Sequence, residues 1–178
     1  MTIVHNHQIR RMIMKKNAAL FVILYLLSLA AMAETATLPD YKVLCDRLAE
    51  IPDWQASQCE GMKVDNPMMG EFVTASRTYT RGRQRIQVTI VSGIQARMMW
   101  SPYAAGTQVE NAESLVKITK MNGYPIGITY DKRNRTGGIV VQLGFQAVMA
   151  AEFEQMDWQS ALKTLQSLDW KAMQALFR

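Results

Sequence analysis

Four arginines lie close together in the chain and give the clearest pattern of residue types that can bind a ligand. They are Arg81, Arg83 and Arg85, with Arg77 shortly before them. A guanidinium group donates paired hydrogen bonds to a carboxylate or a phosphate, so alternating arginines on one sheet face can hold an anion. The pattern predicts a site for a phospholipid, a lipopolysaccharide or an acidic partner protein. The alternative is a solvated strand face whose charges discourage pairing between sheet edges.

Cys45 and Cys59 are the only cysteines of the chain. An even number of cysteines in an exported protein favours a disulfide. Two free thiols or a thiolate metal site are the alternatives, but a zinc site would need carboxylates to complete it because residues 34–178 contain no histidine. We therefore predict one disulfide, and neither a metal nor a cofactor.

The lack of histidine after residue 33 also limits catalysis. It removes Ser-His-Asp and Cys-His nucleophile pairs and the commonest general base. Glu152 and Glu154 share a strand face, a pattern more typical of exposed polar residues than of paired catalytic carboxylates. Gly137-Gly138 precedes a strand rather than a helix, so it does not match a phosphate-binding loop. We expect no catalytic residue and predict that the protein is not an enzyme.

Methionine is abundant in the chain. Exported proteins can bind Cu(I) through thioethers, but the spaced methionine repeats and accompanying histidines of such sites are missing. Core packing and adaptable contact surface explain most of these methionines. Met98, Met99 and Trp100 precede Ser101-Pro102-Tyr103, and this run predicts an exposed apolar loop that contacts a partner.

Residues 1–33 have the pattern of a secretory signal peptide. Basic residues precede an apolar run, Ala18–Leu29, and Ala31-Met32-Ala33 follows as a small-x-small cleavage site. Met1 and Met14 are alternative starts. An uncleaved anchor is the other interpretation, but the run is short for a span of about 20 residues. The pattern predicts cleavage after Ala33, a periplasmic protein, and a mature form that does not span the membrane.

The leader also accounts for most of the positive charge. The whole chain has a formal net charge of +5, from 20 basic and 15 acidic residues, and four of the basic residues lie in residues 1–33. The remaining 16 basic residues are nearly balanced by the 15 acidic ones. This balance argues against a nucleic-acid-binding protein.

Residues 34–178 are predicted to form a single α+β domain. Asp40 can cap a helix over 40–51, and aspartates at 157 and 169 each precede a tryptophan at the start of a helical turn. Asn122-Gly123 between apolar runs indicates a tight hairpin. The predicted strands cover 54–63, 72–80, 84–91, 115–120, 124–130, 139–143 and 146–153, and residues 94–113 are expected to be irregular or briefly helical. An antiparallel sheet of about six or seven strands, with the N- and C-terminal helices packed on one face, satisfies this pattern.

This layout resembles the PsbP/Mog1-like fold and is similar to uncharacterised exported bacterial proteins. The resemblance covers most of residues 40–178 and rests on hairpin and turn residues: Ser76-Arg77-Thr78-Tyr79, Asn122-Gly123-Tyr124-Pro125, Tyr130-Asp131-Lys132 and Leu168-Asp169-Trp170. It implies an accessory or binding protein rather than an enzyme. No functional residue carries over from it, because no shared catalytic motif is present.

The sequence thus favours a non-catalytic periplasmic protein that binds another protein or an envelope component. An immunity protein and an assembly factor are two versions of this hypothesis, and an anionic lipid is a further partner. The alternative is a carrier of lipid or another small ligand, with an apolar cavity between sheet and helices.

Overall fold

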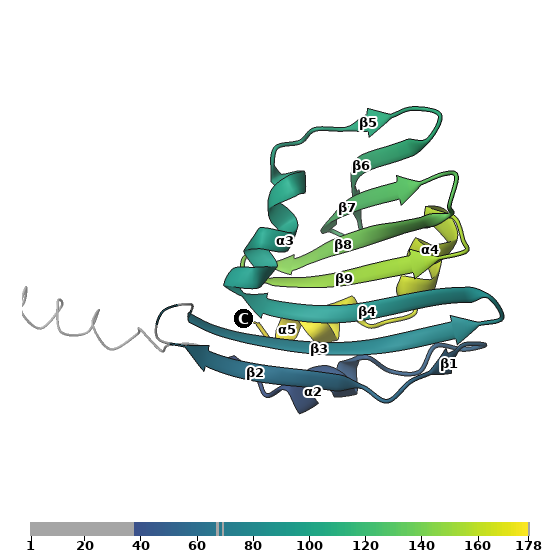
Figure 1. The fold of residues 1–178 in the computed structure, drawn as a ribbon. Coiled ribbons are helices and arrows are strands. Elements are labelled where there is room, and N and C mark those ends of the chain that lie inside the picture. Colours follow the sequence, from purple (N-terminus) through teal and green to yellow (C-terminus); the bar gives the residue numbers. More distant parts are fainter. Residues whose placement is uncertain (1–37, 67, 69, 178) are drawn as a thin grey trace, which may run out of the picture. The chain divides into compact units, whose positions relative to one another are not determined.

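The computed structural model describes residues 38–66, 68 and 70–177, which belong to one compact unit, Thr37–Arg178. The predicted signal peptide and its cleavage site lie outside the described residues. Figure 1 shows a broad sheet with helices on both of its faces. The fold is α+β, as the sequence predicted.

The described helices are short, and an aspartate directly precedes three of them. They are α2 (Tyr41–Arg47), α3 (Ile94–Ala104), α4 (Trp158–Leu165) and α5 (Trp170–Ala175). The side chains of Asp40, Asp157 and Asp169 accept hydrogen bonds from backbone N–H groups in the first turns of α2, α4 and α5. Each carboxylate satisfies a donor that the helix itself cannot pair, which confirms the predicted caps.

The strands form one nine-stranded sheet in which every pairing is antiparallel. They are β1 (Gln55–Ala56), β2 (Glu60–Asn66), β3 (Gly70–Arg81), β4 (Gln84–Gly93), β5 (Val109–Glu110), β6 (Ser114–Met121), β7 (Tyr124–Asp131), β8 (Thr136–Gly144) and β9 (Ala147–Glu154). The strand order is β1-β3-β4-β9-β8-β7-β6-β5, and β2 also pairs with β3.

The main core lies between one face of the sheet and helices α2, α4 and α5. Successive strand residues point to opposite faces, so alternate positions on β4, such as Ile86, Val88 and Ile90, enter this core. The largest fully buried side chains there include Tyr79, Phe153, Met149 and Met156.

The opposite face of the sheet is covered only in part, by α3. A smaller cluster lies beneath this helix and contains Val91, Ala96, Tyr103, Val140, Val148 and Ala150. Figure 1 shows α3 crossing the strands near one end, with the rest of that face free of helices. The N- and C-terminal helices α2, α4 and α5 pack on one face, as predicted, but the sequence did not predict a helix packed on the other face.

The strand count was also too low. The candidate strand over 54–63 is interrupted and forms β1 and β2, while β5 and the helix α3 both lie in the stretch 94–113 expected to be irregular or briefly helical. The first helix ends at Arg47 rather than near residue 51. Within the residues that the structure describes, no helix is long and apolar enough to cross a membrane.

Candidate partner-binding surface

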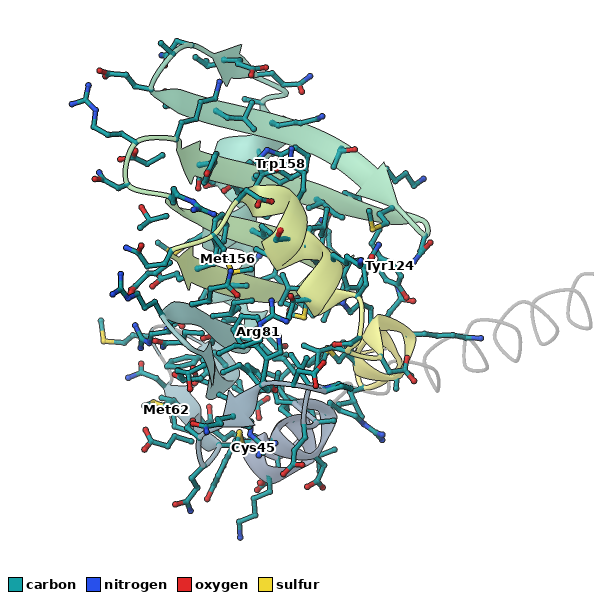
Figure 2. All side chains as sticks on the ribbon, turned by 90° about the vertical axis from the view of Figure 1, so that its right-hand side faces the viewer. Cys45, Met62, Arg81, Tyr124, Met156 and Trp158 are labelled. Carbon is teal, nitrogen blue, oxygen red and sulfur yellow. A yellow bond between two sulfur atoms is a disulfide. The ribbon has the colours of Figure 1, made fainter. Side chains whose placement is uncertain are left out.

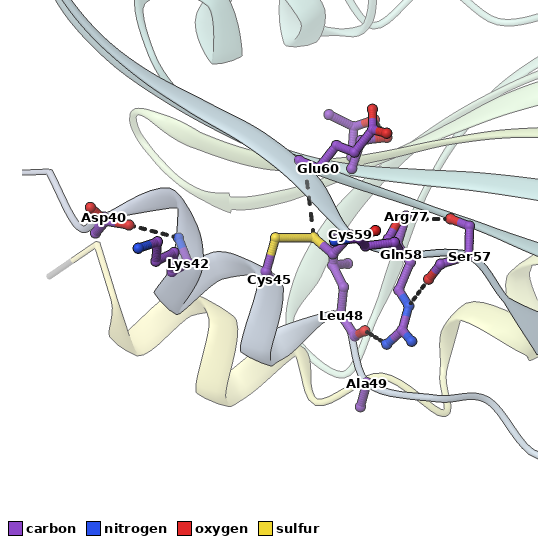
Figure 3. The surroundings of a disulfide bond; sticks show 12 residues. Asp40, Lys42, Cys45, Leu48, Ala49, Ser57, Gln58, Cys59, Glu60 and Arg77 are labelled. Atoms are coloured by element: carbon purple, nitrogen blue, oxygen red, sulfur yellow. Dashed lines mark hydrogen bonds between the residues drawn. A yellow bond between two sulfur atoms is a disulfide. The ribbon is translucent and has the colours of Figure 1, made fainter.

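Cys45 and Cys59 form the predicted disulfide, with a Cα–Cα distance of 5.7 Å. The bond ties the end of α2 to the residue before β2 (Figure 3). It closes the loop that holds Trp54, a buried member of the main core. In the chain-entropy description, closing a loop of about 15 residues stabilises the fold by about 3 kcal/mol.

Arg77 is part of the same corner and does not face a free ligand site. Its Nε donates to the carbonyl oxygen of Ser57 at 2.8 Å, and its Nη1 donates to that of Leu48 at 2.7 Å (Figure 3). Its side chain is largely buried. The guanidinium therefore fixes the loop between the two cysteines by satisfying backbone carbonyls.

Tyr79 supports this corner from the next inward-facing position of β3. Its hydroxyl donates to the carbonyl oxygen of Ala49 at 2.8 Å. Burial raises the pKa of Tyr79 to about 12, although the positive charge of Arg77 opposes the shift. The phenol therefore stays protonated and keeps donating its hydrogen bond at any physiological pH.

The other three arginines do not form a row on one face. Arg81 lies with its guanidinium 4.7 Å from the centre of the Trp54 ring, on the helix-covered side, and also bonds Gln84. Arg85 adjoins inward-facing Ile86, so it points to the opposite face. The spacing Arg81, Arg83, Arg85 runs through the turn between β3 and β4, so alternation within one strand does not apply to it.

Arg83 alone of the four has no hydrogen-bond or ion-pair partner among the described residues. Arg85 pairs with Glu154 at 3.3 Å and bonds Gln87 at 3.0 Å. Gln87 and Thr89 in turn bond the hydroxyl of Ser76. These side chains form a polar network on the face that α3 leaves uncovered, in which each side chain bonds at least one of the others.

The predicted apolar contact residues lie on α3, which is a helix rather than a loop. Met98 is 67% exposed and Met99 is 37% exposed. Trp100 is half-buried against the smaller core and packs on the Tyr103 ring, with 5.6 Å between ring centres. Trp100 therefore anchors the helix, and the two methionines remain available for contact.

Two further exposed apolar residues extend this surface. Ile94 is four residues before Met98 and so shares its side of the helix. Phe145, in the β8–β9 turn, is 76% exposed, and the guanidinium of Arg97 lies 5.7 Å from its ring centre. We call Ile94, Arg97, Met98, Met99 and Phe145 the α3 surface.

Two glycines explain how the chain positions α3. Gly93 joins β4 to the helix at φ 91°, and a Cβ there would lie 2.5 Å from the carbonyl oxygen of Glu71. Gly93 also donates its N–H to the carbonyl oxygen of Gln146 at 2.8 Å, which holds the start of α3 beside Phe145. At the other end, Tyr103 lies directly on Gly127 of β7, where a Cβ would come within 2.3 Å of the ring.

The hollows on the surface of the described residues are lined mainly by polar side chains and glycines, unlike the apolar α3 surface. One of about 430 Å³ lies between the β6–β7 turn and the α4–α5 connection, and its lining includes Asn122, Asp169 and Lys171. Another surrounds Gly137 and Gly138 near the exposed carboxylates of Glu152 and Glu154. No group of three or more histidine, cysteine or carboxylate side chains suited to a metal occurs in the part of the chain that the structure describes.

Comparison with protein-family models, curated proteins and solved structures gives no match to this chain. The resemblance to the PsbP/Mog1-like fold therefore stays a prediction.

Proposed function

We propose that the protein is a non-catalytic accessory protein of the periplasm that binds another protein through the α3 surface. The observation that carries this proposal is the exposure of four large apolar side chains, Ile94, Met98, Met99 and Phe145, from α3 and the adjoining turn. Exposed apolar groups that adjoin one another are characteristic of interaction sites.

The composition of the surface supports a protein as the partner. Methionine, aromatic residues and arginine are enriched in the centres of protein–protein interfaces. Arg97 stacks on Phe145 and so presents a planar charged group together with apolar surface. The unbranched side chains of the two methionines can adapt to the shape of a partner.

The location of the surface supports a preformed binding site. Gly93 and Tyr103 fix both ends of α3 against the sheet, so its exposed side chains are held in place before a partner arrives. A preorganised site loses less conformational entropy on binding than a flexible loop.

Export to the periplasm is part of the same proposal. The disulfide is compatible with an oxidising compartment, where such bonds form and persist. The signal-peptide pattern of residues 1–33 supports the same compartment.

Capture of the partner from cross-linked envelope fractions tests the proposal. The full chain with a C-terminal tag is expected to recover one dominant protein in near-equal amount. The Met98→Gln/Phe145→Gln double variant should recover at least about tenfold less, because hot-spot residues each contribute on the order of 1–2 kcal/mol.

Met62→Gln is the matched control. Met62 is 56% exposed on β2, and Figure 2 shows it near one edge of the sheet, on the side away from α4. It should capture the partner as well as the unchanged protein does. Equal capture by the double variant and the control contradicts binding through the α3 surface. Recovery of lipid without protein supports the carrier hypothesis instead.

A further inference from the structure

The two long edges of the sheet differ in how their backbone groups are protected. At one edge, β5 covers the start of β6, and the side chain of Gln108 accepts a hydrogen bond from the Ile118 N–H. Lys132 and Arg133 hold the same region through ion pairs to Glu110 and Glu113. At the other edge, β2 pairs with β3 over seven consecutive residues, and no described strand lies on its outer side.

The outward-facing backbone groups of β2 follow from the ladder. The Ser57 N–H donates to the carbonyl oxygen of Thr78, which is on the side of β3 away from β4. The backbone groups of the even-numbered residues of β3 therefore point away from β4. Because bonding alternates along an antiparallel pair, even-numbered residues of β2 face β3. The backbone groups of Gly61, Lys63 and Asp65 therefore point outward.

One acidic side chain on this edge has no cationic partner among the described residues of its own chain. Asp65 lies directly opposite Glu71 on β3, and like charges in that arrangement are unfavourable. Lys63 pairs with Glu71 at 2.7 Å. Asp65 has no hydrogen-bond or ion-pair partner among the described residues.

We propose that the β2 edge binds the β2 edge of a second copy of this chain, in an antiparallel pair centred on Val64. In that register Lys63 of each copy lies opposite Asp65 of the other, and both residues have outward backbone groups. The alternative register centred on Lys63 would place two lysines opposite each other. The sequence Lys63-Val64-Asp65 is thus complementary to itself. The Lys63 ammonium, which within its own chain pairs with Glu71 and donates to the carbonyl oxygen of Leu38, would also lie beside the other copy's Asp65.

Apolar groups flank the edge on both faces. Met62 is exposed on one face, and α2, which packs beneath β2 through Tyr41 on Gly61, carries the exposed Val43. The proposed contact is separate from the α3 surface, so the two proposals can fail independently.

Analytical ultracentrifugation of the protein purified after export tests the pairing. Protein concentrations from about 1 µM to about 1 mM cover the dissociation constants expected for a weak dimer formed through a strand edge. The unchanged protein should show a reversible monomer–dimer equilibrium. Asp65→Pro should abolish the dimer, because it removes both an outward N–H and the carboxylate that faces Lys63 of the other copy. It should leave the fold intact, because neither group has a partner among the described residues of its own chain. Lys120→Pro, at an outward position of the opposite edge, is the matched control and should dimerise normally.

A charge exchange tests the register. Lys63→Asp and Asp65→Lys should each weaken the dimer about tenfold by setting like charges opposite each other. The double variant Lys63→Asp/Asp65→Lys should recover to within about threefold of the unchanged protein, since the exchange restores both pairs and keeps a cation beside Glu71. A monomer at every concentration, a dimer unaffected by Asp65→Pro, or a double variant as weak as the single ones overturns the proposal.

Discussion

Arg77 shows how a residue type that suits ligand binding can serve the fold instead. Its guanidinium satisfies two backbone carbonyls of the loop that the disulfide closes. Alternation along the strand directs this side chain to the helix-covered face, where the carbonyls of Leu48 and Ser57 lie within reach. The rigid, planar donors of arginine suit this task better than the flexible ammonium of lysine.

Replacing Arg77 should therefore reduce stability rather than affinity for an anion. Arg77→Ala leaves its carbonyl partners poorly paired, and we expect the free energy of unfolding to fall by about 1–3 kcal/mol. Arg83→Ala is the control and should change it by less than about 0.5 kcal/mol, since Arg83 is exposed and unpaired among the described residues. Urea unfolding measures both, and similar losses for the two variants would contradict the assigned role of Arg77.

Asp157 links the stability of α4 to pH. Its carboxylate accepts the Ser160 N–H at 2.7 Å, and this hydrogen bond holds the pKa of Asp157 below its ordinary value. A folded-state pKa below the unfolded one means that the stabilisation is present above the unfolded pKa, near 3.9, and is lost as pH falls through the folded pKa.

Asp157→Asn separates the charge from the cap. The amide oxygen of asparagine still accepts a hydrogen bond, so the helix keeps its cap, but the contribution of this residue to the acid limb of the stability curve should disappear. Asp157→Ala should cost about 1 kcal/mol at neutral pH. Unfolding measured from pH 7 to pH 3 checks both; an unchanged acid limb in the asparagine variant would show that Asp157 does not contribute to it.

At the scale of elements, α3 depends on a residue that a strand would ordinarily avoid. Gly127 lies in the middle of β7, and the ring of Tyr103 occupies the space where a side chain would stand. This close approach fixes the end of α3 against the sheet.

Gly127→Ala should displace Tyr103 and cost about 1–3 kcal/mol of unfolding free energy, as other overpacking substitutions do. The cost should be smaller when Tyr103 is already alanine, with a coupling of at least about 0.5 kcal/mol. A double-mutant cycle by urea unfolding measures this coupling. Additive effects would mean that Tyr103 does not determine the cost of a side chain at residue 127.

The elements that the sequence predicted are those with strong local signals. Asn122-Gly123 correctly predicted the hairpin between β6 and β7. Asp157 and Asp169 predicted the starts of α4 and α5, and the alternation of apolar residues from Ile86 to Ile90 predicted β4. These features depend on residues within one turn or one strand, so a linear pattern contains them.

The missed elements depend on distant contacts. Both sides of α3 carry apolar residues, so it lacks the one-sided pattern of a helix packed against a core. Its exposed side belongs with Phe145, about fifty residues later in the chain, which only the fold brings beside Arg97. An aromatic residue in the tight Gly144-Phe145-Gln146 turn was the available signal for this part of the surface.

At the scale of the whole molecule, the proposed export has a direct consequence for the purified protein. The intact mass of the chain recovered from the periplasm should correspond to a start at Glu34 and should be lighter by two hydrogens, because of the Cys45–Cys59 bond. Reduction should restore those two hydrogens. A mass that retains residues 1–33 would contradict the predicted cleavage.

Site-directed photo-cross-linking in living cells tests whether the protein binds a partner protein through the α3 surface. A photoreactive amino acid at Met98 and, separately, at Phe145 should each give the same adduct with a second protein. The same probe at Arg83, in the turn between β3 and β4, should give no such adduct. An adduct from Arg83 with none from Met98 or Phe145 would contradict the claim and support an arginine-centred site instead.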